Sequence, residues 1–171
     1  VKTELTDLTQ VMEKLRSETF VDKSKMSLFG ASQGGVVASL YAAAYPDSVH
    51  KLLLIFPAFV LFDDAKATYH ELGSPDFDQL PDSLTHHNTT LGKIYLIDAL
   101  DIDIRAEQAK ITTPTLIING TDDAVVPYQY AVQANQTIPN AELVTVEGGE
   151  HRIDERFAIT AAPAIQKFLK E

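Results

Sequence analysis

The clearest chemical pattern in this sequence is a G-x-S-x-G segment, Gly30-Ala31-Ser32-Gln33-Gly34. In that pattern a serine at a sharp turn between a strand and a helix presents its hydroxyl group as a nucleophile. The flanking residues must be small so that strand and helix can approach each other, and Gly30, Gly34 and Gly35 meet this need. The backbone amide of Gln33, at the start of the helix, is expected to donate a hydrogen bond to an oxyanion.

A candidate acid follows a later apolar run, in Gly120-Thr121-Asp122-Asp123. Open α/β sheets place their sites at the C-terminal ends of strands, and a carboxylate there can orient a histidine. Asp123 is favoured over Asp122 because of its spacing in the sequence from the following Val126-Pro127. The alternative role for either aspartate is to cap a turn or a helix.

A candidate base lies in the glycine-rich segment Gly148-Gly149-Glu150-His151, after the next apolar run. Only His151 follows a strand in the order serine, aspartate, histidine, so His50, His70, His86 and His87 are expected to be solvated. In such a set the serine attacks an acyl carbonyl, the histidine moves the proton, and the aspartate holds the imidazole. This chemistry requires no metal and no cofactor.

Alternating apolar runs and amphipathic stretches predict the elements that position these residues. Their order predicts an α/β fold with a parallel sheet covered by helices. Strands are expected at 25–31, 51–57, 115–119 and 142–146, and helices at 4–18, 34–45, 128–136 and 153–170. Pro163 is expected to kink the last helix or to start one of its turns. Residues 58–110 break the alternation and are interpreted as an insertion over the sheet edge, with one helix at 90–100.

Composition narrows the class of protein. The 171 residues suffice for one domain, and a formal charge of −10 argues against nucleic acid as a partner. There is no cysteine for disulfides or thiolate metal sites, and no stretch reaches the length of a membrane span. The chain starts at Val1 without a leader pattern, so we expect a larger N-terminal part outside this sequence and a cytoplasmic location.

These motifs resemble the α/β-hydrolase superfamily, and within it the bacterial cinnamoyl or feruloyl esterases and their monoacylglycerol-lipase-like relatives. The resemblance covers nearly the whole chain and rests on the segments 30–39, Tyr45-Pro46-Asp47, Leu91-Gly92-Lys93-Ile94-Tyr95, 120–123 and 148–151. It implies an α/β-hydrolase fold in which the insertion forms a cap over the serine. It also implies that Asp64 and Tyr95 bind the phenolic hydroxyl of a hydroxycinnamate; their alternative roles are a solvated acid and a packing aromatic.

Two departures from the family pattern matter. Ala31 stands where the family often has histidine, and the strands before residue 1, with the His-Gly loop that supplies a second oxyanion amide, are not in this sequence. We therefore expect residues 1–171 to be the C-terminal part of one hydrolase domain.

The leading hypothesis is a serine hydrolase that cleaves a small carboxylic ester, with hydroxycinnamate esters as one candidate class. A thioesterase or acyl peptidase would use the same residues, and a non-catalytic ligand-binding module would keep the fold and its pocket but do no chemistry. A haloalkane dehalogenase is disfavoured because Ser32 stands where that chemistry needs a carboxylate. The oligomeric state is left open.

Overall fold

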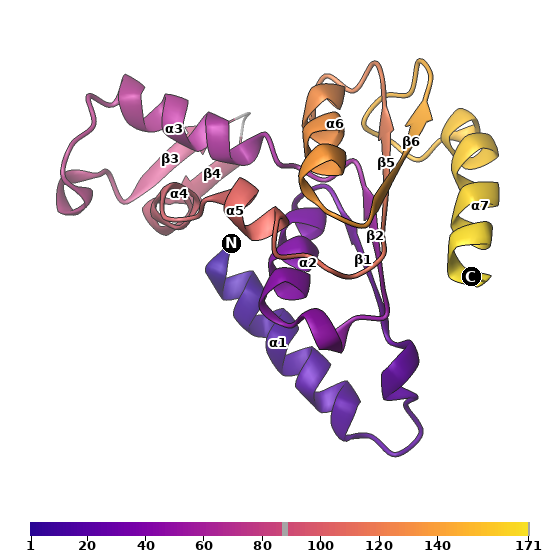
Figure 1. The fold of residues 1–171 in the computed structure, drawn as a ribbon. Coiled ribbons are helices and arrows are strands. Elements are labelled where there is room, and N and C mark those ends of the chain that lie inside the picture. Colours follow the sequence, from indigo (N-terminus) through magenta and orange to yellow (C-terminus); the bar gives the residue numbers. More distant parts are fainter. Residues whose placement is uncertain (87–88, 171) are drawn as a thin grey trace.

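A parallel sheet of four strands forms the centre of the computed structural model, which describes residues 1–86 and 89–170 (Figure 1). The strand order is β1-β2-β5-β6. The strands are β1 (Ser27–Ala31), β2 (Lys51–Ile55), β5 (Thr115–Gly120) and β6 (Ala141–Val146). Every residue of β2 and β5 is buried, as expected for apolar strands in the middle of a sheet covered on both faces.

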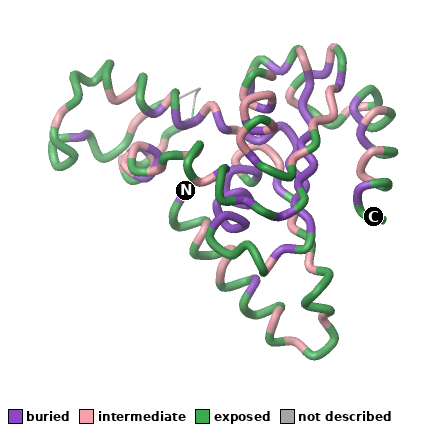
Figure 2. The backbone as a smooth tube through the Cα atoms, viewed as in Figure 1, coloured by how far each residue is buried: buried purple, intermediate pink, exposed green. Residues whose placement is uncertain are grey.

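Helices cover both faces of this sheet (Figure 1). The helices α2 (Gln33–Ala44) and α6 (Tyr128–Thr137) lie on one face, with α1 (Lys2–Ser17) packed against α2, and α7 (Glu155–Lys170) lies on the other. Successive residues of β2 point to opposite faces: Leu52 and Leu54 join the core on the α2 side, and Leu53 joins the core under α7. Figure 2 shows the buried residues gathered in the sheet and in α2.

Residues 58–110, which we call the cap segment, follow β2 and precede β5 in the sequence. The cap segment extends to one side of the sheet as an arm (Figure 1). Its helices are α3 (Leu61–Glu71), α4 (Lys93–Leu100) and α5 (Ile104–Gln108), and its strands β3 (Ser83–His86) and β4 (Thr89–Gly92) form an antiparallel hairpin. The predicted helix at 90–100 starts later, at Lys93, because residues 89–92 pair with β3.

The predicted fold class is confirmed, with small shifts in the bounds of the elements. The strand predicted at 51–57 ends at Ile55, because Phe56 has a positive φ of 34°. Helix α7 runs through Pro163 as a single element. His50 and His70 are exposed, as predicted, whereas His87 and the side chain of His86 lie outside the described residues.

No helix in the described part of the chain is long and apolar enough to cross a membrane. Across residues 1–86 and 89–170, no group of three or more histidines, cysteines or acidic residues is arranged to hold a metal ion.

Candidate active site

Ser32 lies at the turn between β1 and α2, with a backbone φ of 52° that residues other than glycine rarely adopt. The turn is possible because β1 and α2 come very close: a Cβ atom on Gly30 would lie 2.4 Å from the carbonyl oxygen of Gly34, and one on Gly35 would lie 2.8 Å from Pro57. The prediction that residue 34 must be a glycine for strand and helix to approach is wrong, since a Cβ atom on Gly34 would meet nothing within 4 Å. Two of the three glycines are therefore required by packing.

The structure brings the three predicted catalytic side chains into one hydrogen-bonded chain. His151 Nε2 lies 3.1 Å from Ser32 Oγ, and His151 Nδ1 lies 2.8 Å from Asp123 Oδ2. An ionised carboxylate only accepts hydrogen bonds, so Nδ1 carries the proton and Nε2 is left to accept from the serine hydroxyl. The imidazole is thereby oriented to take a proton from Ser32.

The two adjacent aspartates after β5 have different environments. The side chain of Asp123 is fully buried, and its Oδ1 accepts hydrogen bonds from the backbone amides of Val125 at 2.9 Å and Val126 at 2.7 Å. Asp122 is exposed, and its carboxylate accepts a hydrogen bond from the hydroxyl group of Thr121. Of the two aspartates, only Asp123 forms a hydrogen bond with the imidazole, through Oδ2, while its Oδ1 is bonded to the backbone amides of the turn.

The loops after β5 and β6 are held together by close backbone contact. The amide of Asp122 donates to the carbonyl of Gly149 at 3.0 Å, and a Cβ atom on Gly120 would lie 2.1 Å from that same oxygen. The amide of Gly148 donates to the hydroxyl group of Thr121 at 2.8 Å. These contacts fix the distance between the two loops that carry Asp123 and His151.

Gln33 follows Ser32 as the first residue of α2, and its backbone N–H forms no hydrogen bond within the described residues. A free N–H at a helix N-terminus is a donor for an anion. Its side chain is held from two sides: Nε2 donates to both carboxylate oxygens of Glu4 at 2.8 Å, and Oε1 accepts from the hydroxyl group of Tyr95 at 3.4 Å. Sequence reasoning missed Glu4, since nothing in its helical pattern connects it to residue 33.

Asp64 and Tyr95, the two predicted substrate-binding residues, line one cavity of about 180 Å³. Its other walls are mostly apolar and come from α3, the hairpin, α4 and the turn after Asp123, where Val125 and Val126 contribute. Burial, and then the negative charges of Glu4 and Asp64, raise the pKa of Tyr95, which keeps its hydroxyl group a donor. Ser32 is adjacent to this cavity rather than in its wall, since its carbonyl accepts from the amide of Ala58, a wall residue.

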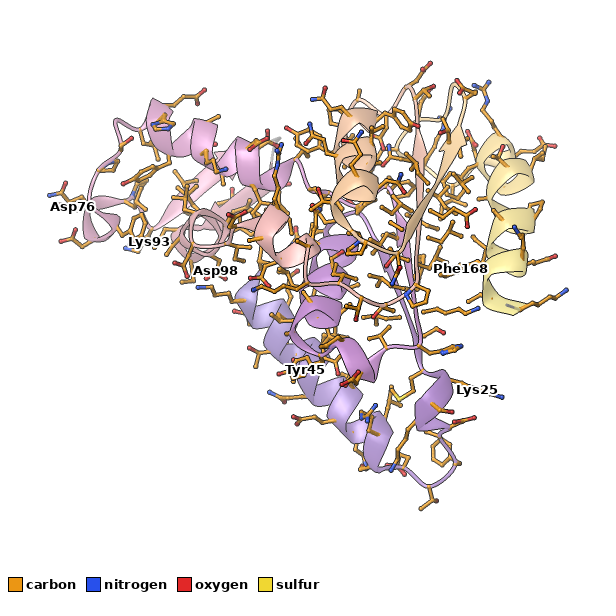
Figure 3. All side chains as sticks on the ribbon, in the orientation of Figure 1. Lys25, Tyr45, Asp76, Lys93, Asp98 and Phe168 are labelled. Atoms are coloured by element: carbon orange, nitrogen blue, oxygen red, sulfur yellow. The ribbon has the colours of Figure 1, made fainter. Side chains whose placement is uncertain are left out.

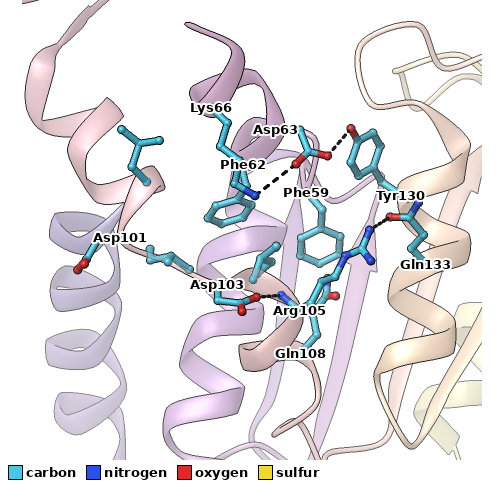
Figure 4. Close-up of a pocket in the computed structure, with 13 residues that line it drawn as sticks. Phe59, Phe62, Asp63, Lys66, Asp101, Asp103, Arg105, Gln108, Tyr130 and Gln133 are labelled. Atoms are coloured by element: carbon cyan, nitrogen blue, oxygen red, sulfur yellow. Dashed lines mark hydrogen bonds and ion pairs between the residues drawn. The ribbon is translucent and has the colours of Figure 1, made fainter. Parts of the chain in front are cut away.

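A second cavity, of about 390 Å³, lies on the other side of α3 between the cap segment and α6 (Figure 4). Two hydrogen bonds join residues that line it: Tyr130 donates to Asp63 at 3.0 Å, and Arg105 donates to Gln133 at 3.0 Å. Burial and the carboxylate of Asp63 raise the pKa of Tyr130 to about 12. These bonds join α3 and α5 to α6 and so hold the cap segment to the body of the molecule.

Phe56 is a further residue of the site that sequence reasoning missed. Its ring centroid lies 4.3 Å from that of His151, and its side chain is buried. The apolar run Lys51 to Pro57 predicts an ordinary strand there, and no residue pattern signals the positive φ that turns the ring.

This parallel sheet with helices on both faces, and a serine at a strained strand-to-helix turn, is the architecture of an α/β-hydrolase. A family model described as the prolyl oligopeptidase family matches residues 2–171, and the chain belongs to that family.

Solved structures have the same fold. The chain is 28% identical to Est1E from Butyrivibrio proteoclasticus, with a TM-score of 0.82 over 98% of this chain and 70% of that one. Est1E with ferulic acid bound gives a TM-score of 0.81. A monoacylglycerol lipase from Paleococcus ferrophilus, 16% identical with a TM-score of 0.68 over 99% of this chain and 75% of that one, shares the fold.

Curated relatives match over shorter segments. YisY of Bacillus subtilis, an AB hydrolase superfamily protein, is 29% identical over 157 residues, which cover 72% of this chain and 59% of YisY. RutD of Stutzerimonas stutzeri, which carries the provisional name of a carbamate hydrolase, is 40% identical over 70 residues, or 40% of this chain. The chain spans 26% of the length of that RutD.

Proposed function

We propose that this protein is a serine hydrolase that cleaves carboxylic esters through an acyl-enzyme intermediate. The observation that carries the proposal is the hydrogen-bonded chain from Ser32 Oγ through His151 to Asp123, with separations of 3.1 and 2.8 Å. Each of the three residues follows a different strand at one end of the sheet, where the site of an open parallel sheet belongs. The likeness to Est1E, which has been solved with ferulic acid bound, supports a reaction that releases a carboxylic acid.

In the first half of the reaction, Ser32 Oγ attacks the carbonyl carbon while His151 Nε2 takes the hydroxyl proton. The backbone N–H of Gln33 donates to the oxyanion of the tetrahedral intermediate. The carbon–oxygen bond to the leaving group then breaks, and His151 gives the proton to the departing alkoxide, which leaves as an alcohol.

In the second half, water attacks the acyl group on Ser32 and its proton passes to His151. The bond between the acyl carbon and Oγ breaks, the serine oxygen regains the proton, and a carboxylic acid leaves. Asp123 keeps the imidazole in the required tautomer throughout and stabilises its charged form.

For the substrate class we propose esters of hydroxycinnamic acids. The cavity beside Ser32 is lined mostly by apolar side chains and contains one carboxylate, Asp64, and one phenol, Tyr95. An aryl ring would fill the apolar part, and a phenolic hydroxyl could donate to Asp64 and accept from Tyr95, whose proton would then turn from Gln33 Oε1 to the substrate. The similarity to Est1E, for which a complex with ferulic acid is known, supports this class.

A second candidate is the hydrolysis of an amide or an acylated peptide, which the match to the prolyl oligopeptidase family favours. The same three residues would perform it, because a serine, histidine and aspartate set attacks ester and amide carbonyls alike. The two candidates differ in the leaving group, an alcohol in one and an amine in the other.

The test measures hydrolysis of methyl ferulate, 4-nitrophenyl butyrate and a prolyl 4-nitroanilide by the complete gene product and by its Ser32→Ala variant. We expect both esters to be cleaved faster than the anilide, with a loss of at least about 10³-fold in kcat in the variant. Faster cleavage of the anilide would favour the second candidate. Unchanged ester cleavage by Ser32→Ala would contradict both.

The substrate class has its own matched test, because methyl cinnamate differs from methyl p-coumarate only in lacking the phenolic hydroxyl. The Asp64→Asn variant should raise KM for p-coumarate about tenfold and leave KM for cinnamate within about twofold. Equal effects on the two esters would show that Asp64 does not recognise the hydroxyl group.

A further inference from the structure

Phe56 has a backbone conformation that its residue type disfavours. Its φ is 34°, although a bulky side chain resists positive φ and the following Pro57 restricts the backbone further. The amide of Phe56 still donates to the carbonyl of Ile118 on β5 at 2.7 Å, as in a regular parallel strand, so the departure from strand geometry begins at the φ angle of this residue. Strained residues of this kind gather at functional sites, and Ser32 at φ 52° is the nearby example.

The strain changes the face of the sheet to which the ring points. Side chains alternate along a strand, so residue 56 of a regular β2 would point to the face opposite Ile55. Instead, Phe56 and Ile55 belong to the same apolar cluster, on the face covered by α7. His151 lies next to this cluster, and its ring centroid is 4.3 Å from that of Phe56 at an interplanar angle of 52°. The ring of Phe157 in α7 also lies near that of Phe56, with a centroid distance of 5.9 Å.

The hydrogen bond from His151 to Asp123 directs Nδ1, but a hydrogen bond tolerates some tilt of the imidazole plane. A ring packed against the imidazole limits this tilt and so holds Nε2 at Ser32 Oγ. An aromatic ring also attracts a cation, and the imidazole becomes charged when it takes the serine proton. Among the described side chains, Asp123 is the one charged group bonded to this imidazole; Glu150 and Arg152 beside it pair with each other at 3.4 Å.

We propose that Phe56 is the positioning residue of His151: its strained backbone turns an aromatic ring onto the imidazole, which sets the plane of the base and favours its charged form. This inference rests on the proposed function, because it assigns a role relative to the general base of that reaction. It adds a fourth side chain to the three that the sequence pattern indicates.

The test compares Phe56→Leu with Phe168→Leu in the complete gene product. Phe168 belongs to the same apolar cluster and lies at the far end of α7, beside Lys51 at the opposite end of β2 (Figure 3). Both changes remove a buried ring from one cluster, and only the first removes the contact with His151. Phe56→Met, whose unbranched and flexible side chain can adapt to the space of the ring but has no ring itself, is the second variant in case Phe56→Leu folds poorly.

We expect Phe56→Leu to lower kcat for 4-nitrophenyl butyrate about tenfold, with KM within about twofold, since a ring contact contributes on this order to the charged state. Phe168→Leu should lower Tm and leave kcat within about twofold of the parent protein. The low-field proton resonance of the bond between His151 and Asp123 should stay sharp in Phe168→Leu and broaden in Phe56→Leu.

Equal kcat values for the two variants, or a sharp low-field resonance in Phe56→Leu, would overturn the role of Phe56. The Ser32→Ala variant belongs in the same series. Activity that persists in Ser32→Ala means that the proposed function fails. Activity that is lost in Ser32→Ala but unchanged in Phe56→Leu means that only this inference fails.

Discussion

At the scale of single residues, the turn after β5 decides which aspartate faces the imidazole. One carboxylate oxygen of Asp123 accepts hydrogen bonds from two backbone amides, and the other is bonded to His151. The carboxylate therefore cannot rotate without losing hydrogen bonds. Asp122 precedes it by one residue and is exposed. The amides that hold Asp123 belong to Val125 and Val126, which is the physical basis for the offset before Val126-Pro127 seen in the sequence.

Replacement of Asp123 by asparagine should lower kcat about 10⁴-fold, because the amide no longer favours the tautomer with a proton on Nδ1. The matched control is Asp122→Asn, one residue earlier in the same turn, which should keep kcat within about twofold. Steady-state kinetics on 4-nitrophenyl butyrate measures both variants. A larger loss of kcat in Asp122→Asn than in Asp123→Asn would show that Asp122, and not Asp123, is the catalytic acid.

Residue types and spacing predicted Ser32, Asp123 and His151, and the structure places them within hydrogen-bond distance of one another. Phe56 and Glu4 could not be predicted in this way. The position of the Phe56 ring depends on a backbone angle that no local pattern encodes, and Glu4 meets Gln33 only because α1 packs on α2.

At the scale of elements, the contact of β1 with α2 sets the geometry of the serine turn. A methyl group on Gly30 would lie 2.4 Å from a backbone oxygen, whereas one on Gly34 would point into open space. Gly30→Ala should therefore lower the free energy of unfolding by about 1–3 kcal/mol and reduce kcat.

The control at the same turn is Gly34→Ala, which should raise the free energy of unfolding by up to about 1 kcal/mol because alanine favours the helix. Urea unfolding measures both variants. If Gly34→Ala destabilised the protein as much as Gly30→Ala, the close approach would not be the reason for the glycine at position 30.

The strands of the sheet could be predicted because continuous apolar runs of strand length are typical of buried parallel strands. The cap segment was predicted less well. Helix α3 buries only Leu61, Phe62 and Ala65, too few apolar positions to give a clear helical period. The first residues of the predicted helix at 90–100 instead belong to β4, which pairs with β3.

At the scale of the whole molecule, α3 is a wall shared by two cavities. Asp64 and Ala65 face the cavity beside Ser32, whereas Phe62 and Asp63 face the cavity at α6. The cap segment thus provides most of the wall around the proposed substrate, and the body provides the residues for the chemistry. The formal charge of −10 is consistent with a neutral substrate such as an ester.

The central claim is that Ser32 is an activated nucleophile, and covalent labelling with a fluorophosphonate tests it most directly. Intact mass of the complete gene product should show one phosphonyl adduct, and the modified peptide should contain Ser32. The Ser32→Ala variant should take up none, and His151→Ala should react at least about 10³-fold more slowly. A parent protein that remains unlabelled, or a Ser32→Ala variant that is labelled as fast as the parent, would contradict the account.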